Sequence, residues 1–140
     1  MRALHLSSIV ALSLALAACS DSTGPSTDPN LPSVAGVWVG TWGSSTAQLV
    51  LTQHGDQVSG TLKLGPRTRP VTGSVSVGEL RFASEVDQSD CSIYASSGLA
   101  VASQAGTMTG IMARRSGSKI CDPNAGGRVG VQQGTLSLAR

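Results

Sequence analysis

Residues 58–77, VSGTLKLGPRTRPVTGSVSV, contain two short runs in which apolar and polar residues alternate. In each run the apolar residues and one glycine fall on one face, while Ser, Thr and Lys fall on the other. The positions predicted to face inward are Val58, Gly60, Leu62, Leu64, Val71, Gly73, Val75 and Val77. A period of two residues is typical of a β-strand with one solvated face. The stretch therefore predicts two neighbouring strands of a sheet.

The same alternation continues on both sides of this stretch. In ELRFASEV, Leu80, Phe82 and Val86 are predicted to face inward. The segments predicted as strands are 34–43, 47–54, 57–65, 69–77, 79–86, 92–103, 105–115 and 128–139. Eight antiparallel strands joined by hairpins can close into an up-and-down barrel, which removes exposed edges. We therefore predict an all-β, eight-stranded antiparallel up-and-down barrel over residues 34–140.

Four predicted strands share a glycine near Thr or Ser, at Gly60, Gly73, Gly110 and Gly134. Glycine inside a strand lowers its stability and has no side chain to pack. Its recurrence at a similar phase predicts bends where the sheet coils on itself.

The amino-terminal residues have the pattern of a secretory signal. Arg2 precedes an apolar run over residues 4–16, and small residues follow the run. The run is shorter than the ~20 residues that a membrane-spanning helix needs. Residues 16–19, LAAC, resemble the bacterial lipobox, which implies that the Cys19 thiol receives a diacylglycerol and that the chain is cut before it. The alternative is an ordinary signal peptide cut near Ala18.

The lipobox resemblance divides the chain into a signal peptide over 1–18, a lipidated cysteine with a tether over 19–33, and the barrel domain. The tether is rich in Ser, Thr, Pro and Asp, a composition typical of flexible linkers. We expect an exported protein that is attached to the membrane through the Cys19 lipid. Ser20 stands where some lipoproteins carry the aspartate that retains them in the inner membrane, so in a two-membrane host the outer membrane is favoured.

Two cysteines remain once Cys19 is acylated. In an oxidising compartment Cys91 and Cys121 are predicted to form a disulfide, which would stabilise the fold by about 3–4 kcal/mol on the chain-entropy model. The alternative is two separate buried thiols.

The stretch GVWVGTW, residues 36–42, is similar to the opening of lipocalins, in which a glycine precedes a tryptophan on the first strand. GTW and the following LVLTQHGDQVSGTL also resemble the first strands of avidin-type barrels. These resemblances imply a calycin-like barrel in which Trp38 or Trp42 closes one end. The aromatic residues Trp38, Trp42 and Tyr94 are the predicted lining of a ligand site. The aromatic side chains are too few for an avidin-like pocket, so biotin is not the predicted ligand.

Charge and composition exclude several function classes. The chain has 10 Lys and Arg against 8 Asp and Glu. Loss of Arg2 with the signal leaves 9 against 8, a net charge of +1, so nucleic acid is not a predicted partner. Beyond the signal the only histidine is His54, in a predicted hairpin turn, and there is no nucleophile elbow. We therefore expect a protein that is not an enzyme and uses no cofactor.

Charged residues near Cys91 and before the last loop are candidate binding groups. Glu85, Asp87 and Asp90 have the oxygen ligands for a hard cation, but their spacing matches no standard calcium loop, and a solvated turn is predicted instead. Arg114 and Arg115 are predicted to lie at the rim of the barrel, on opposite faces of one strand. No metal site is predicted.

Two functions remain open. The first is a barrel that binds a small apolar or amphipathic ligand, since eight strands enclose a space that is either filled or just wide enough for one small molecule. The second is a surface-tethered protein-interaction module with a filled barrel, either inhibitor-like or a structural envelope lipoprotein, in which the loop over residues 115–128 contacts the partner. We expect a monomer in both cases.

Overall fold

The computed structural model describes residues 29–140, so the predicted signal peptide, Cys19 and the tether up to residue 28 lie outside the described residues. The elements are β1 (Gly36–Trp42), β2 (Ser45–His54), β3 (Gln57–Leu64), β4 (Arg67–Ser76), β5 (Glu79–Ser84), β6 (Ser92–Ala102), β7 (Thr107–Ser116), α1 (Ser118–Cys121) and β8 (Gly130–Ala139). All eight predicted strands are present. Within residues 29–140 no helix is long and apolar enough to cross a membrane.

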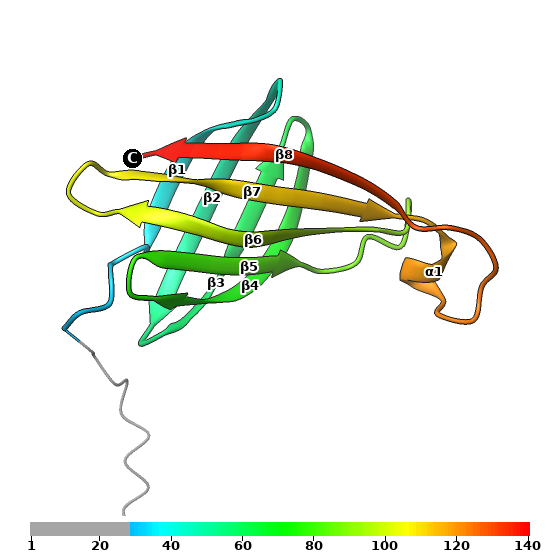
Figure 1. Ribbon diagram of the computed structural model, residues 1–140, viewed down its shortest axis with the longest axis horizontal. Helices are drawn as coiled ribbons and strands as arrows, with labels where there is room; N and C mark the ends of the chain where they lie inside the picture. Colours follow the sequence, from blue (N-terminus) through cyan, green and yellow to red (C-terminus); the bar gives the residue numbers. More distant parts are fainter. Residues whose placement is uncertain (1–28) are drawn as a thin grey trace, which may run out of the picture.

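The strands form one closed antiparallel barrel. Each strand pairs with the next along the chain, and β8 returns to pair with β1. Figure 1 shows this meander, with the chain passing once around the barrel from β1 to β8. The predicted up-and-down topology is therefore confirmed.

The core is built from the inward-facing residues of every strand. The buried apolar residues are Val34, Trp38, Trp42, Ala47, Leu49, Leu51, Val58, Leu62, Val71, Val75, Leu80, Phe82, Tyr94, Leu99, Met108, Met112, Leu136 and Leu138. Val77 was wrongly predicted to face inward. Its side chain is 72% exposed because β4 ends at Ser76 and Val77 belongs to the turn before β5.

The middle of the barrel is filled with side chains. Those without any accessible surface include Leu49, Leu80, Leu99, Met108, Met112 and Leu136, which come from β2, β5, β6, β7 and β8. A void large enough for a water molecule would give its lining atoms accessible surface. These residues therefore border no such void, and this part of the interior is packed.

The chain enters the barrel at the end that we call the proximal end, and its last residue closes this end. Trp38 Nε1 donates a hydrogen bond of 2.8 Å to the carbonyl oxygen of Val34. The guanidinium of Arg140 lies 4.2 Å from the centre of the Trp38 ring and donates to the carbonyl oxygens of Ser33 and Ala35. A cation above an indole face is attracted by the ring electrons. The segment before β1 is thereby fixed to the barrel.

The opposite end, which we call the distal end, carries four connections, over residues 43–44, 65–66, 85–91 and 117–129. Figure 1 shows α1 and its loop far from the point where the described chain begins. The prediction of an irregular connection there was partly wrong, because residues 118–121 form one helical turn.

The strand glycines allow neighbouring strands to approach closely. A Cβ atom on Gly60 would lie 1.8 Å from the carbonyl oxygen of Val50, and one on Gly73 would lie 2.0 Å from that of Arg81. Gly134 differs, because it faces the Trp42 indole at 3.0 Å. Glycine is therefore required at Gly60 and Gly73, where the neighbouring strand lies too close for a Cβ atom.

Replacing Gly60 with alanine is expected to lower the free energy of unfolding by about 2 kcal/mol or more, because the added methyl group collides with backbone that cannot move independently. Urea unfolding monitored by tryptophan fluorescence measures the change. Gly126→Ala is the matched control, since a Cβ at Gly126 meets nothing within 4 Å. Equal unfolding midpoints for the two variants would contradict the close strand approach.

Candidate functional site at the distal end

The structure brings two of the three predicted lining residues together. Trp42 and Tyr94 meet at the distal end in an edge-to-face contact, with ring centres 5.6 Å apart. Trp42 Nε1 donates to the carbonyl oxygens of Met112, at 3.0 Å, and Gly134, at 3.2 Å. Trp38 lies at the proximal end, so it cannot share a site with the other two. All three side chains are buried, and their role as ligand-lining residues stays a prediction.

A buried arginine lies against this aromatic pair. Arg69 on β4 is only 5% exposed, and its guanidinium carbon lies 4.9 Å from the centre of the Tyr94 ring. Arg69 Nη1 donates to the carbonyl oxygen of Ser92 at 3.1 Å, and Nη2 lies 2.9 Å from Asp87 Oδ2. A buried charge is costly unless it is paired. The ion pair with Asp87 supplies this pairing.

Asp90 joins three arginines from two different strands. Its Oδ2 accepts a hydrogen bond from Arg114 Nη2 at 3.1 Å and another from Arg67, and it lies 3.6 Å from Arg69 Nη2. Its Oδ1 accepts from the Ser92 hydroxyl. Asp87 and Asp90 lie in the predicted turn before Cys91 with partly exposed side chains, and the ion pairs with arginines were not predicted. We call these five residues, Arg67, Arg69, Arg114, Asp87 and Asp90, the distal charge network.

The network holds both carboxylates in their charged form. The pKa of Asp90 is well below its usual 3.8, mainly because Ser92 donates to it and also because Arg67 and Arg114 do. The pKa of Asp87 is lowered mainly by hydrogen bonds from the side chain and backbone of Ser89. Three arginines against two aspartates leave the distal charge network with a net charge of +1.

Arg69 is not fully satisfied within the network. Its Nε and Nη2 atoms are buried and find no hydrogen-bond acceptor among residues 29–140. Nη2 is close to Asp87, but its N–H does not point at the carboxylate, so the contact is an ion pair without a hydrogen bond. Neither nitrogen is accessible to solvent. Arg69 is therefore the buried member of the network, whereas the Arg67 side chain is 55% exposed.

The predicted disulfide is present beside this network. Cys91 and Cys121 are bonded, with their Cα atoms 5.2 Å apart, and Cys91 directly follows Asp90. The backbone N–H of Gly117 donates to the carbonyl oxygen of Cys91 at 3.0 Å. Within the loop, Ser118 Oγ donates to the carbonyl oxygen of Gly126 at 2.8 Å. The 117–129 loop is therefore held in one place on the distal end.

β7 and β8 continue together beyond the closed part of the barrel. β7 pairs with β8 over the whole length of β8, from Gly130 to Ala139. β1 pairs with β8 only from Leu136 to Ala139. Barrel closure was predicted to remove exposed edges, and this prediction was wrong for the first half of β8. Strand lengths alone did not indicate how far β8 would extend past β1.

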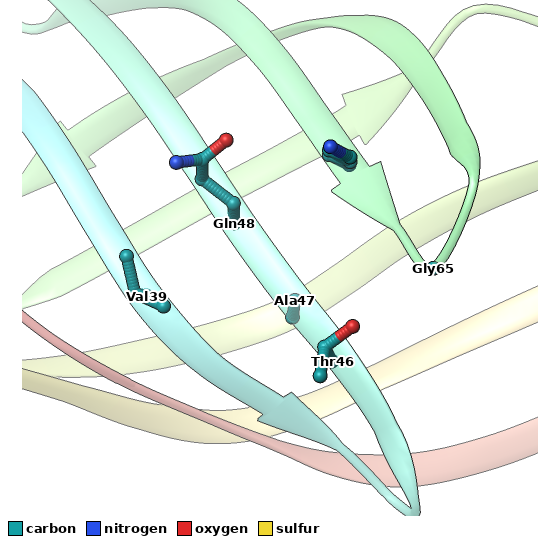
Figure 2. A pocket seen from close by; sticks show the side chains of 6 residues that line it. Val39, Thr46, Ala47, Gln48 and Gly65 are labelled. Carbon is teal, nitrogen blue, oxygen red and sulfur yellow. The ribbon is translucent and has the colours of Figure 1, made fainter.

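A shallow hollow of about 200 Å³ lies on the outer wall, near the distal ends of β1, β2 and β3. Figure 2 shows Val39, Thr46 and Gln48 on the two neighbouring strands that border it, with Gly65 at the nearby turn. Lys63 is its only lining residue that carries a charge. The lining of the hollow therefore contains no carboxylate, histidine or cysteine side chain.

No group of three or more His, Cys, Asp or Glu side chains within residues 29–140 is placed to hold a metal ion. Comparisons with protein-family models, with curated proteins and with solved structures find no match to this chain. The topology that the lipocalin and avidin resemblance implied is present, and no family match extends the resemblance beyond topology.

The Asp90→Asn variant is expected to lower the free energy of unfolding by about 2 kcal/mol at pH 7, because the arginines lose a shared carboxylate. The pKa of Asp90 is lower in the folded chain than in the unfolded chain. Its contribution is therefore complete above about pH 4 and is lost as the pH falls further. The difference between wild type and variant should shrink below pH 4, as measured by urea unfolding at several pH values.

Asp56→Asn is the matched control for this series, since Asp56 lies exposed in the β2–β3 turn outside the distal charge network. A D56N effect as large as that of D90N would contradict a specific role for Asp90.

Replacing Cys91 and Cys121 together with serine is expected to lower the free energy of unfolding by about 3–4 kcal/mol, because the bond closes a loop with a sequence separation of 30. The change is measured by urea unfolding in a C19S background, so that the third cysteine does not affect the result. The unfolding midpoint of the reduced wild-type protein should approach that of the double variant. Identical midpoints for oxidised and reduced protein would contradict a stabilising bond.

Proposed function

We propose that the protein is a membrane-tethered, non-enzymatic interaction module whose distal end binds a protein partner. The observation that carries this proposal is the packed interior, where core side chains from opposite walls have no accessible surface. A ligand inside the barrel would have to displace these side chains, whereas a protein partner needs only the outer surface. The barrel then acts as a rigid scaffold for the distal connections.

The tether supports a particular orientation of the domain. Export and acylation of Cys19 are part of the proposal, and they rest on the LAAC sequence and on the apolar run before it. The disulfide supports an oxidising compartment, because such bonds are rare in reducing ones. The chain joins the barrel at the proximal end (Figure 1), so a membrane at the tether leaves the distal end pointing away from the lipid. In a host with two membranes we place the anchor in the outer membrane.

The distal end also offers polar contacts on a fixed framework. Arg115, Lys119 and Arg128 are exposed there, with Asp122 as an exposed acidic side chain of the same loop. Because the disulfide and the hydrogen bonds of the loop hold it in place, binding would cost little ordering entropy. A preorganised basic surface favours an acidic partner.

Site-specific photo-crosslinking in the native host tests the proposal. A photoreactive residue at Lys119 or Asn124, both exposed in the distal loop, is expected to give one discrete protein adduct shared by the two positions. The matched control positions are Val77 and Gln104, which are exposed at the proximal end and are expected to give no such adduct. Equal adducts from both ends, or none from the distal loop, would contradict the proposal.

Native mass spectrometry of the protein from its own host distinguishes the small-ligand alternative. The expected mass is that of the acylated polypeptide without an additional small molecule. A stoichiometric apolar ligand would contradict the filled-scaffold proposal.

A further inference from the structure

We propose that the free edge of β8, residues 130–134 with the sequence GVQQG, accepts an extended acidic segment of the partner as an additional β-strand. The inference rests on the proposed function, since it names where on the distal end the partner binds and what chemistry it brings. Addition of a strand to an exposed sheet edge supplies backbone hydrogen bonds for affinity and side-chain contacts for specificity.

The backbone groups that would bind the segment follow from the sheet register. In an antiparallel sheet, the N–H and C=O groups of alternate residues point to the same side of the strand. Gly43 N donates to Thr135 O at 3.3 Å, so Thr135 presents its backbone groups to the β1 side. Gln133 and Val131 must then present theirs to the same side. Since β1 ends at Trp42, no strand within residues 29–140 pairs with them there.

The edge lacks the features that usually prevent strand addition. Natural edges are protected by charged side chains, proline or bulges. Residues 130–135 read GVQQGT and contain neither a charge nor a proline, and their register with β7 shows no shift. Gly130, Val131, Gln132 and Gln133 are exposed, with Val131 at 55%. A regular, uncovered strand edge is therefore open to an incoming segment.

The charges beside the edge select the chemistry of that segment. Val131 is paired with Arg115 on β7, so both side chains lie on the same face of the sheet. A residue added opposite Val131 has its side chain on this face as well, about 10 Å from β7 across two strand spacings. A long acidic side chain at this position can reach across the short Val131 side chain and form an ion pair with Arg115. Arg128, which is exposed just before β8, adds to the positive potential.

The same charges disfavour a second copy of this chain as the occupant. Two β8 edges paired with each other would bring Arg115 and Arg128 of one copy toward those of the other. Like charges placed across neighbouring strands are destabilising. An acidic peptide avoids this charge repulsion and is attracted by Arg115 and Arg128.

The test uses two synthetic probes, a fluorescein-labelled acidic peptide TEVEVEVT and its basic counterpart TKVKVKVT, with the disulfide-bonded C19S protein. Fluorescence anisotropy is expected to show saturable binding of the acidic peptide and at least tenfold weaker binding of the basic one. Gln133→Pro removes an outward N–H and should lower the affinity for the acidic peptide at least tenfold. An edge strand tolerates proline where the N–H faces solvent. Gln133→Ala keeps the N–H and should bind like wild type.

Amide hydrogen exchange by NMR locates the bound peptide without relying on a variant that folds. Protection is expected to increase at the amides of Val131 and Gln133. The amide of Gln132, which pairs with Arg114 on β7, is expected to be protected with and without the peptide. Arg115→Glu should reverse the preference between the two peptides.

Protection elsewhere on the distal end, or equal binding of both peptides, would overturn this inference while leaving the interaction module intact. A concentration-dependent dimer with protected Val131 and Gln133 in the absence of peptide would overturn the choice of occupant. Loss of the distal crosslinks in the host, by contrast, would refute the proposed function itself.

Discussion

The short seam between β1 and β8 is the constraint on which the rest of the structure depends. Only Val39–Trp42 and Leu136–Ala139 pair there, so four residues on each strand close an eight-stranded sheet. Gly40 lies in this seam, and a Cβ atom at its position would fall 1.9 Å from the carbonyl oxygen of Ser137. The tryptophans of β1 lie at the two ends of the seam, and each indole N–H donates to a carbonyl oxygen, so packing and hydrogen bonding support closure together.

The chemistry of the interior changes along the barrel. Where the wall is closed, the interior is filled by Leu, Val and Met side chains. Near the distal end the interior is filled instead by Tyr94, Trp42 and the buried guanidinium of Arg69, with Asp87 and Asp90 supplying the opposite charge. Charged side chains can fill this part of the interior because the five residues of the distal charge network are linked by hydrogen bonds and ion pairs. The disulfide at Cys91 fixes the turn that carries both aspartates.

The sequence was sufficient to predict the strands, because most of them have an apolar face with a period of two. It also contained the signal for Arg69, since extending the phase of Val71, Gly73 and Val75 backward by two residues places Arg69 on the inner face. Its acidic partners were not predictable in the same way. Asp87 and Asp90 lie in a connection without periodicity, and ion pairs between distant segments depend on the three-dimensional course of that connection. Val77 was misplaced because the alternation runs on into the turn residues, where the strand phase no longer determines exposure.

The separation between the tether and the distal end has a mechanical consequence. If the protein is held at its amino terminus and bound at the opposite end, tension runs along the strands rather than across them. β1, which receives the load first, is paired with β2 through seven residues and with β8 through four. A load parallel to a strand strains all of these pairings at once, whereas a load across the sheet opens them one at a time. Under such a load the meander would therefore place the β1 pairings in shear.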